Sequence, residues 1–301
     1  MELKWLEDML LLLETGSFSK AARYRNITQP AFSRRIRSLE NWLGATLVDR
    51  RRNPLRFTRA ALNTEAEMRH LVNGFYELRG RVRAETQSKR RMIFTTQHTL
   101  TVTHLPRLLH FLERRRPRIA YRVRSANKEE CVTQMARGEA DFLLCYEMPS
   151  LGTGLASGTV RRMQLGRERL LPVTACGAPN IPIHVPQEGE PLPLLLYPED
   201  SFLGQVLRDT CLPRVLKTYS IETVCESAFS VGVKEMTMSG LGIAWLPLGL
   251  VEAELARGIL YSHEETLGAC EMSMSLYAAA TPSSAETERV WQELERAGPS
   301  F

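Results

Sequence analysis

SKAARYRNITQPAFSRRIRSLENWLG, the stretch Ser19–Gly44, determines most of what the sequence predicts about the fold. The apolar residues of its second half recur at steps of four, three and four: Phe32, Ile36, Leu39 and Leu43. This spacing is the stripe of an amphipathic helix. Ser17 or Ser19 can cap a short helix before the turn, and Thr28 can cap the longer helix after it. The stretch therefore predicts a helix-turn-helix.

The opposite face of the longer helix is polar and basic. It carries Gln29, Ser33, Arg34, Arg37 and Asn41. In the DNA major groove, Arg can pair with guanine and Gln with adenine, and a helix of this kind can lie in that groove. An ordinary helical hairpin with a solvated basic face remains the alternative.

Charge is distributed unevenly along the 301 residues, whose net charge is +5. Residues 1–92 hold 19 Lys and Arg against 10 Asp and Glu, a net charge of +9, and the remainder has a net charge of −4. A basic segment on an acidic body is typical of a protein that binds phosphates. The length allows two or three domains.

A small β-hairpin is predicted after the helix-turn-helix, with strands at 46–50 and 55–58. The loop between them is basic, and Arg50 and Arg52 are placed to contact phosphates or reach the minor groove. A solvated loop would have the same composition. The hairpin together with the helices predicts a winged helix-turn-helix.

Residues 60–87 predict one long helix. Its apolar positions alternate steps of three and four: Ala61, Thr64, Met68, Leu71, Phe75, Leu78 and Val82. Such a heptad seam is typical of a helix that pairs with a copy of itself, although a helix packed on its own domain could also carry it. Two heads joined in this way would fit a palindromic DNA site.

From Met92 onward the pattern alternates strands with helices. Strands predicted at 92–96, 119–123 and 141–146, with helices between them, indicate an α/β sheet with parallel strands. A second half follows, with strands at 170–175, 194–197, 218–223 and 242–246 and helices at 202–212 and 227–239. Two α/β lobes predict a cleft between them.

Ligand groups in such a cleft are expected at strand ends and helix N-termini, which favour anions. The effector-binding candidates at those places are His98, Thr99, Thr101, Ser125, Ser201 and Ser227. Each hydroxyl could instead be an ordinary helix cap, and His98 an ordinary surface histidine. Phe202 and Phe229 beside them could line the pocket or belong to the core.

An oxidant is the alternative signal. The six cysteines contain no CxxC spacing, and we expect reduced thiols. Cys211 and Cys225 could pair if the fold brings them together, and Met236 and Met238 could be oxidised, although filling the core is the default role of both methionines.

Catalytic, metal-binding and membrane signatures are not found in the sequence. There is no nucleophile elbow, P-loop, metal-spaced His cluster or paired-carboxylate pattern, so we expect no enzyme activity, metal or cofactor. No signal peptide and no apolar stretch long enough to span a bilayer are present, so we expect a cytoplasmic protein without a membrane partner.

The whole chain resembles the LysR-type transcriptional regulators. The resemblance is carried by SFSKAARYRNITQPAFSRRIRSLENWLGATLVDR, FTRAA, the long helix, GEADFLL and GLGIAWLP, and within the family QPAFSRRIR and GIAWLP look most like the hypochlorite-responsive subgroup. One departure is the missing glycine after Thr58, where Arg59, Ala60 and Ala61 follow. The turn into the long helix must then use ordinary backbone angles.

The resemblance implies a domain organisation. A winged helix-turn-helix would occupy 1–59, a linker and dimerisation helix 60–88, and an effector domain like type II periplasmic binding proteins 89–301. Lobe I would comprise about 92–161 and 268–301, and lobe II about 162–267. The resemblance also implies homodimers or homotetramers and a small co-inducer between the lobes.

We therefore expect a sequence-specific DNA-binding transcriptional regulator, switched by a small molecule or an oxidant, with promoter DNA, itself and RNA polymerase as partners. By the resemblance Gln29, Pro30, Ser33 and Arg34 face the bases and Arg37 and Arg52 lie near phosphates. The DNA-binding candidates are Thr28, Gln29, Pro30, Ser33, Arg34, Arg37, Arg50 and Arg52. The alternative is a cytoplasmic small-solute-binding protein with a non-specific basic DNA-binding arm.

Overall fold

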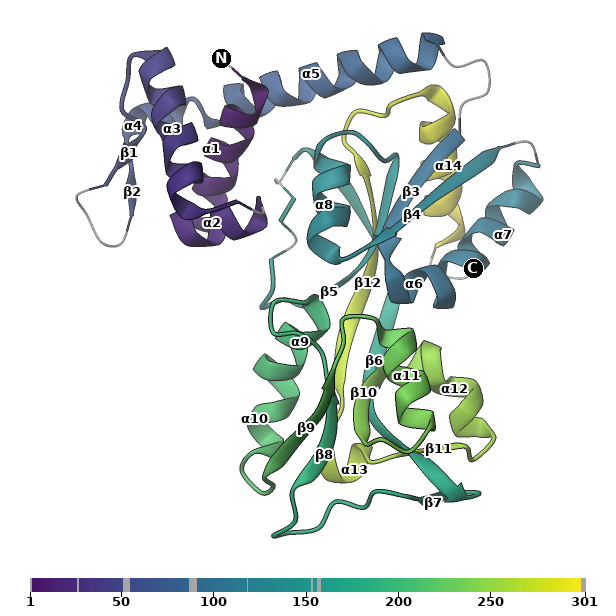
Figure 1. Ribbon diagram of the computed structural model, residues 1–301. Coiled ribbons are helices and arrows are strands. Elements are labelled where there is room, and N and C mark those ends of the chain that lie inside the picture. The colour runs from purple at the N-terminus through teal and green to yellow at the C-terminus, as the bar shows by residue number, and fades with distance from the viewer. Residues whose placement is uncertain are drawn as a thin grey trace.

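A helical head, a long connecting helix and a two-lobed α/β body make up the protein in the computed structural model (Figure 1). The structure describes residues 2–25, 27–50, 55–86, 91–117, 119–152, 154–155 and 158–298. The two predicted parts, a helix-turn-helix and an α/β domain, are both present.

The head is built on three helices, α1 (Leu3–Thr15), α2 (Phe18–Tyr24) and α3 (Gln29–Leu43). Ser17 caps α2 and Thr28 caps α3, each accepting a hydrogen bond from a backbone N–H of the first turn. Gly44 ends α3 with φ 68°, a left-handed conformation that glycine adopts without strain.

The predicted apolar stripe of α3 packs inward, with one exception. Phe32, Ile36 and Leu39 are completely buried in the head core. Leu43 was expected to join them but is 43% exposed, because the last turn of α3 extends beyond that core.

The predicted wing is present. Its strands β1 (Val48–Asp49) and β2 (Arg56–Phe57) pair antiparallel, Val48 with Phe57 and Asp49 with Arg56. Arg52, one of the DNA-binding candidates, lies outside the described residues. Thr58 follows the wing with φ −73° and caps the next helix, so the turn without glycine uses ordinary angles as expected.

The long linker is two helices rather than one, α4 (Arg59–Asn63) and α5 (Glu65–Thr86). The break falls at Thr64, whose hydroxyl donates to the Ala60 carbonyl at 2.7 Å. Threonine in a helix competes for backbone hydrogen bonds in this way and favours a bend.

The body contains one continuous sheet in the order β4-β3-β5-β12-β6-β10-β8-β9, with β7 and β11 paired to β6. The strands are β3 (Arg91–Gln97), β4 (Ala120–Ala126), β5 (Phe142–Glu147), β6 (Val160–Ala178), β7 (Ile181–Pro182), β8 (Leu192–Leu196), β9 (Ile221–Glu226), β10 (Ile243–Pro247), β11 (Leu260–Ser262) and β12 (Cys270–Ala279). β3, β4 and β5 are parallel, which confirms the parallel pairing predicted for the first three strands of the body, and β8, β9 and β10 are parallel as well.

The strands β6 and β12 run antiparallel through both lobes and connect them. The sequence predicted only residues 170–175 of β6, because Val160–Arg169 is polar and alternating where the strand crosses between the lobes.

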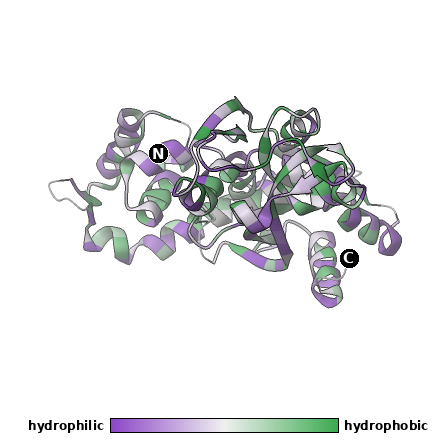
Figure 2. Cartoon of the chain, turned by 90° about the horizontal axis from the view of Figure 1, so that it is seen from below, coloured by the Kyte–Doolittle hydropathy of each residue, from purple (hydrophilic) through white to green (hydrophobic). Residues whose placement is uncertain are grey.

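Helices cover both faces of the sheet (Figure 1), and hydrophobic and hydrophilic segments alternate along the outer helices (Figure 2). Lobe I carries α6 (His98–Thr103), α7 (Leu105–Arg115), α8 (Lys128–Ala136) and α14 (Ala285–Ala297). Lobe II carries α9 (Phe202–Val206), a π-helical turn (Leu207–Cys211), α10 (Leu212–Val215), α11 (Ser230–Met238), α12 (Leu248–Ala256) and α13 (Glu264–Leu267).

Two helix predictions in the body were wrong in detail. One helix was expected between the first strand and Leu112, but the structure has two, α6 and α7, separated at His104. Pro106 lies in the first turn of α7, a position that proline favours at the start of a helix. The helix expected from Ser227 begins at Ser230, so Ser227 is not its cap.

Candidate nucleic-acid interface and effector site

The outer face of α3 presents the predicted reading residues to solvent. Gln29, Arg34 and Arg37 are exposed, and Ser33 is half-buried between them. Arg34 Nε donates only a long hydrogen bond, 3.4 Å, to the Pro30 carbonyl one turn earlier. The Thr28 hydroxyl caps α3 by accepting a hydrogen bond from the Ala31 backbone N–H, and it thereby fixes the first turn of the reading helix.

Arg35 faces the other way and holds the head together. Its guanidinium lies 3.3 Å from Asp8 Oδ2, and Arg25 Nε donates to Asp8 Oδ1 at 2.5 Å. Asp8 is completely buried; burial raises its pKa, and the two arginines oppose that rise. The sequence did carry a signal for this buried cluster, because Asp8 stands within the apolar run of α1, but the cluster was not predicted.

Arg50 is anchored at the base of the wing. Glu40 of α3 accepts hydrogen bonds from the backbone N–H groups of Leu47 (2.8 Å) and Val48 (3.1 Å) and from Arg50 (2.7 Å). The Arg50 guanidinium also lies 5.8 Å from the Phe18 ring centre. Glu40 therefore fixes the wing to the reading helix, and Arg50 takes part in that contact.

The effector candidates of lobe I form a hydrogen-bonded cluster at the end of β3 and β4. Thr101 Oγ1 donates to Ser125 Oγ at 2.9 Å, and the Ser125 hydroxyl lies 2.9 Å from His98 Nδ1. His98 begins α6 directly after β3, and Ser125 is near the end of β4, which places both at the same edge of the sheet.

The two lobes meet beside this cluster. The hydroxyls of Thr99 in lobe I and Ser230 in lobe II are 2.5 Å apart, and the His98 ring packs edge-on against Phe229 with centres 5.9 Å apart. Ser201 caps α9 in lobe II, and Ser227 accepts from the Phe229 backbone N–H. The structure thus brings the start of α6 in lobe I and the start of α11 in lobe II together.

Lys128 also lies at this junction, although its sequence position did not predict it. It is the first residue of α8, its side chain is buried, and its ammonium lies 4.3 Å from the ring centre of Phe202 in lobe II. Among the described residues its Nζ has no hydrogen-bond partner. Burial lowers the pKa of Lys128 because the charged form loses its hydration.

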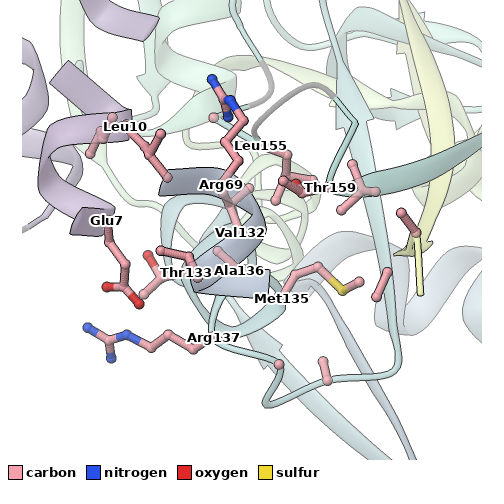
Figure 3. Close-up of a pocket in the computed structure, with 18 of the residues that line it drawn as sticks. Glu7, Leu10, Arg69, Val132, Thr133, Met135, Ala136, Arg137, Leu155 and Thr159 are labelled. Carbon is pink, nitrogen blue, oxygen red and sulfur yellow. The ribbon is translucent and has the colours of Figure 1, made fainter. Parts of the chain in front are cut away.

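A hollow lies between the head and lobe I (Figure 3). It encloses about 280 Å³, and α1 and α5 face α8 and the end of β12 across it. Glu7 and Arg137 extend toward each other at its rim in Figure 3, and apolar side chains form its walls. The apolar residues include Leu10, Leu11, Val72, Val132, Met135 and Leu155.

The linker helix also contacts the body directly. Arg79 of α5 donates to the Arg137 carbonyl at 3.2 Å and lies 3.7 Å from Glu139. α8 therefore has one end at the lobe junction, at Lys128, and the other beside the head and linker, at Arg137.

The predicted heptad seam divides into two parts. Ala61 and Met68 are buried in the head core, whereas Leu71 and Leu78 are 60% and 52% exposed. Phe75 and Val82, on the same seam, are similarly exposed. The second half of the seam thus presents large apolar side chains on the surface of the subunit.

Family models match both parts of the chain. The bacterial regulatory helix-turn-helix protein model of the lysR family matches residues 3–62, and the LysR substrate binding domain model matches residues 86–298. The chain belongs to the LysR family of transcriptional regulators. It combines a DNA-binding winged head with an effector-binding domain, as the sequence predicted.

Individual relatives agree with this assignment. The chain is 28% identical to the HTH-type transcriptional regulator YjiE of Escherichia coli K12, over 97% of this chain and 94% of YjiE. Full-length HypT of Salmonella typhimurium, a hypochlorite-specific LysR-type regulator, matches with a TM-score of 0.61 and 27% identity, covering 100% of this chain and 99% of HypT. Vibrio fischeri DarR, solved in complex with DNA, matches at 0.57 and 26% identity, covering 97% and 98%.

These similarities favour the regulator over the solute-binding alternative, and the similarity to HypT agrees with the predicted subgroup. The named relatives are transcriptional regulators rather than enzymes. No helix in the described part of the chain is both long and apolar enough to cross a membrane.

Proposed function

We propose that this regulator binds its operator through the exposed face of α3 and is switched by a small anionic ligand held at the lobe junction. The base-facing residues are Gln29, Pro30, Ser33 and Arg34, with Arg37 near a phosphate. The exposure of this face, on a helix whose other side is fixed by the head core and by Arg35, supports the assignment.

The ammonium of Lys128, which has no hydrogen-bond partner in the described part of the chain, carries the proposal for the ligand. A buried charge without a hydrogen-bond partner costs several kcal/mol, and the contact with the Phe202 ring, which contributes about 2 kcal/mol, compensates only part of that cost. The nearby carboxylate of Glu147 is occupied by Arg162, Ser275 and Tyr277. A carboxylate or halide bound at Lys128 would supply the missing charge. The Thr101, Ser125 and His98 cluster offers further hydrogen-bonding groups to such a ligand.

Helix α8 is the element that couples this ligand to the head. Its first residue, Lys128, contacts lobe II, and its last turns line the hollow against α1. A ligand that draws the lobes together at Lys128 would displace α8 as a rigid body, and Val132 and Arg137 would transmit that shift to the head and linker.

Replacing Lys128 with Met tests the ligand directly. We expect Lys128→Met to raise the free energy of unfolding of the ligand-free protein by about 1–3 kcal/mol, because the desolvated charge is removed while the apolar stem is kept. Wild type is expected to be stabilised saturably by bromide, acetate or sulfate at matched ionic strength, as mass action requires. The variant should lose that response.

Thermal melts of wild type, Lys128→Met and Lys217→Met provide the measurement. Lys217 is exposed, so Lys217→Met is a matched control that should behave as wild type. The proposal would be contradicted if Lys128→Met were less stable than wild type or responded to each anion as wild type does.

The assembly we propose is a homodimer or homotetramer joined through the exposed seam of α5, acting in the cytoplasm with RNA polymerase as a further partner. The exposed side chains of Leu71 and Leu78 support this assembly, because leucines one heptad apart on a helix surface are typical of the interface between two paired helices.

A further inference from the structure

The hollow between the head and lobe I separates two hydrophobic cores of the subunit. On one side, Leu10 of α1 and Val72 of α5 belong to the head core. On the other side, Val132 and Met135 of α8 belong to a smaller core of lobe I. All four side chains are buried, and the two cores are separate clusters. The hollow is therefore a space with facing apolar walls that neither core fills.

The volume of the hollow, about 280 Å³, fits a small organic molecule. An apolar cavity of about 150 Å³ stays free of water and binds benzene. By that measure the hollow can hold a compact molecule of about 10–12 non-hydrogen atoms, the size of two fused aromatic rings. Water is a poor occupant of the space between these walls, because an ordered water needs about two to four polar partners.

Two arginines at the hollow are already paired with carboxylates of the head. Arg25 lies 2.5 Å from Glu7, and Arg69 lies 2.9 Å from Glu14. A charged ligand that entered the hollow would lose its hydration and would compete with these ion pairs for its counter-charge.

The other charged side chains of the lining are also compensated. Asp141 accepts a hydrogen bond from the Ile93 backbone N–H at 2.9 Å. Glu129 lies in the first turn of α8 and Arg137 follows its last residue, and the helix dipole stabilises each charge at that end. Arg137 is in addition exposed to solvent. The lining therefore favours an uncharged ligand.

We propose that this hollow is a binding site for an uncharged aromatic molecule of about two fused rings, which joins the head to lobe I. The bound molecule contacts α1 and α5 on one side and α8 on the other, and it fixes the head relative to the effector domain. Only the consequence for operator binding rests on the proposed function, because binding of the molecule itself requires no DNA.

The probe for this site is 2-naphthol, which has two fused rings and is uncharged at neutral pH. Calorimetric titration onto the full-length protein without DNA measures its binding, and we expect one molecule per subunit. At about ten times the dissociation constant, the melting temperature should rise by about 2–4 °C. The anion 2-naphthoate, which has the same rings, should bind more weakly by about tenfold or more.

Ala136→Phe tests the location of the site. Ala136 is the last residue of α8 and lies in the wall of the hollow (Figure 3), so a phenyl ring there should weaken binding by about tenfold or more. Ala256→Phe is the matched control, because Ala256 is the exposed last residue of α12 in lobe II and is likewise followed by Arg and Gly. Ala256→Phe and Lys128→Met should both bind 2-naphthol as wild type does, which separates the hollow from the lobe junction.

Titration of the wild type needs no variant to fold, so it can overturn the proposal alone. Absence of binding up to the solubility limit of 2-naphthol, tighter binding of 2-naphthoate, or unchanged binding by Ala136→Phe would contradict it. Binding that appeared only on dilution to the single subunit would show that a second copy of the chain fills the hollow, which also contradicts it. Operator binding by the ligand-free protein is independent of these outcomes, so failure here leaves the proposed DNA and ligand sites standing.

Discussion

Arg34→Ala is expected to weaken binding to the operator by about 10–100-fold, since one bidentate arginine–guanine pair contributes about 1–3 kcal/mol. The Arg34 side chain is exposed, and its hydrogen bond to the Pro30 carbonyl is long, so its loss should leave the stability of the head unchanged. Titration of operator duplex, followed by fluorescence anisotropy, measures the affinity, and circular dichroism melts check the fold.

Two other arginines make this test specific. Arg257→Ala removes the same charge from an exposed position in lobe II and should bind as wild type does. Arg35→Ala should instead lower the melting temperature, because it leaves buried Asp8 with Arg25 alone. If Arg34→Ala bound the operator as tightly as wild type, α3 would not be the reading helix.

Leu71→Glu combined with Leu78→Glu is expected to raise the dissociation constant of the oligomer by about 100-fold or more. Each leucine buried between paired α5 helices contributes about 2 kcal/mol, and every 1.4 kcal/mol corresponds to tenfold. Because one head covers only half of a palindromic site, loss of the oligomer should also lower the affinity for the operator. Analytical ultracentrifugation measures the assembly.

Leu216→Glu is the matched control for the seam variants, because Leu216 is 54% exposed at the end of α10, away from α5. It should sediment as wild type does. Unchanged sedimentation of the double seam variant would show that subunits associate through another surface.

The head was predictable in detail because its determinants are local. Helix caps at Ser17 and Thr28, the stop at Gly44 and the stripe through Phe32, Ile36 and Leu39 depend on residues within a few positions of one another. The same holds for the parallel strands of each lobe, whose βα alternation is visible in the sequence.

What the sequence did not show depends on contacts between distant segments. Lys128 looks like an ordinary surface residue at a helix start, until Phe202, 74 positions later, covers it. Likewise, Arg35 and Arg34 are neighbours in sequence, and only the position of Asp8 shows that they face opposite ways.

The measurement that tests the account most directly is a nuclease-protection titration of the wild-type protein on the DNA upstream of its own gene, beside a scrambled duplex, at two salt concentrations. The account predicts protection of two half-sites about one helical turn apart, with a preference over the scrambled duplex that persists at the higher salt. Equal binding to both duplexes that disappears as salt rises would show only phosphate contacts, and would contradict sequence-specific recognition by α3.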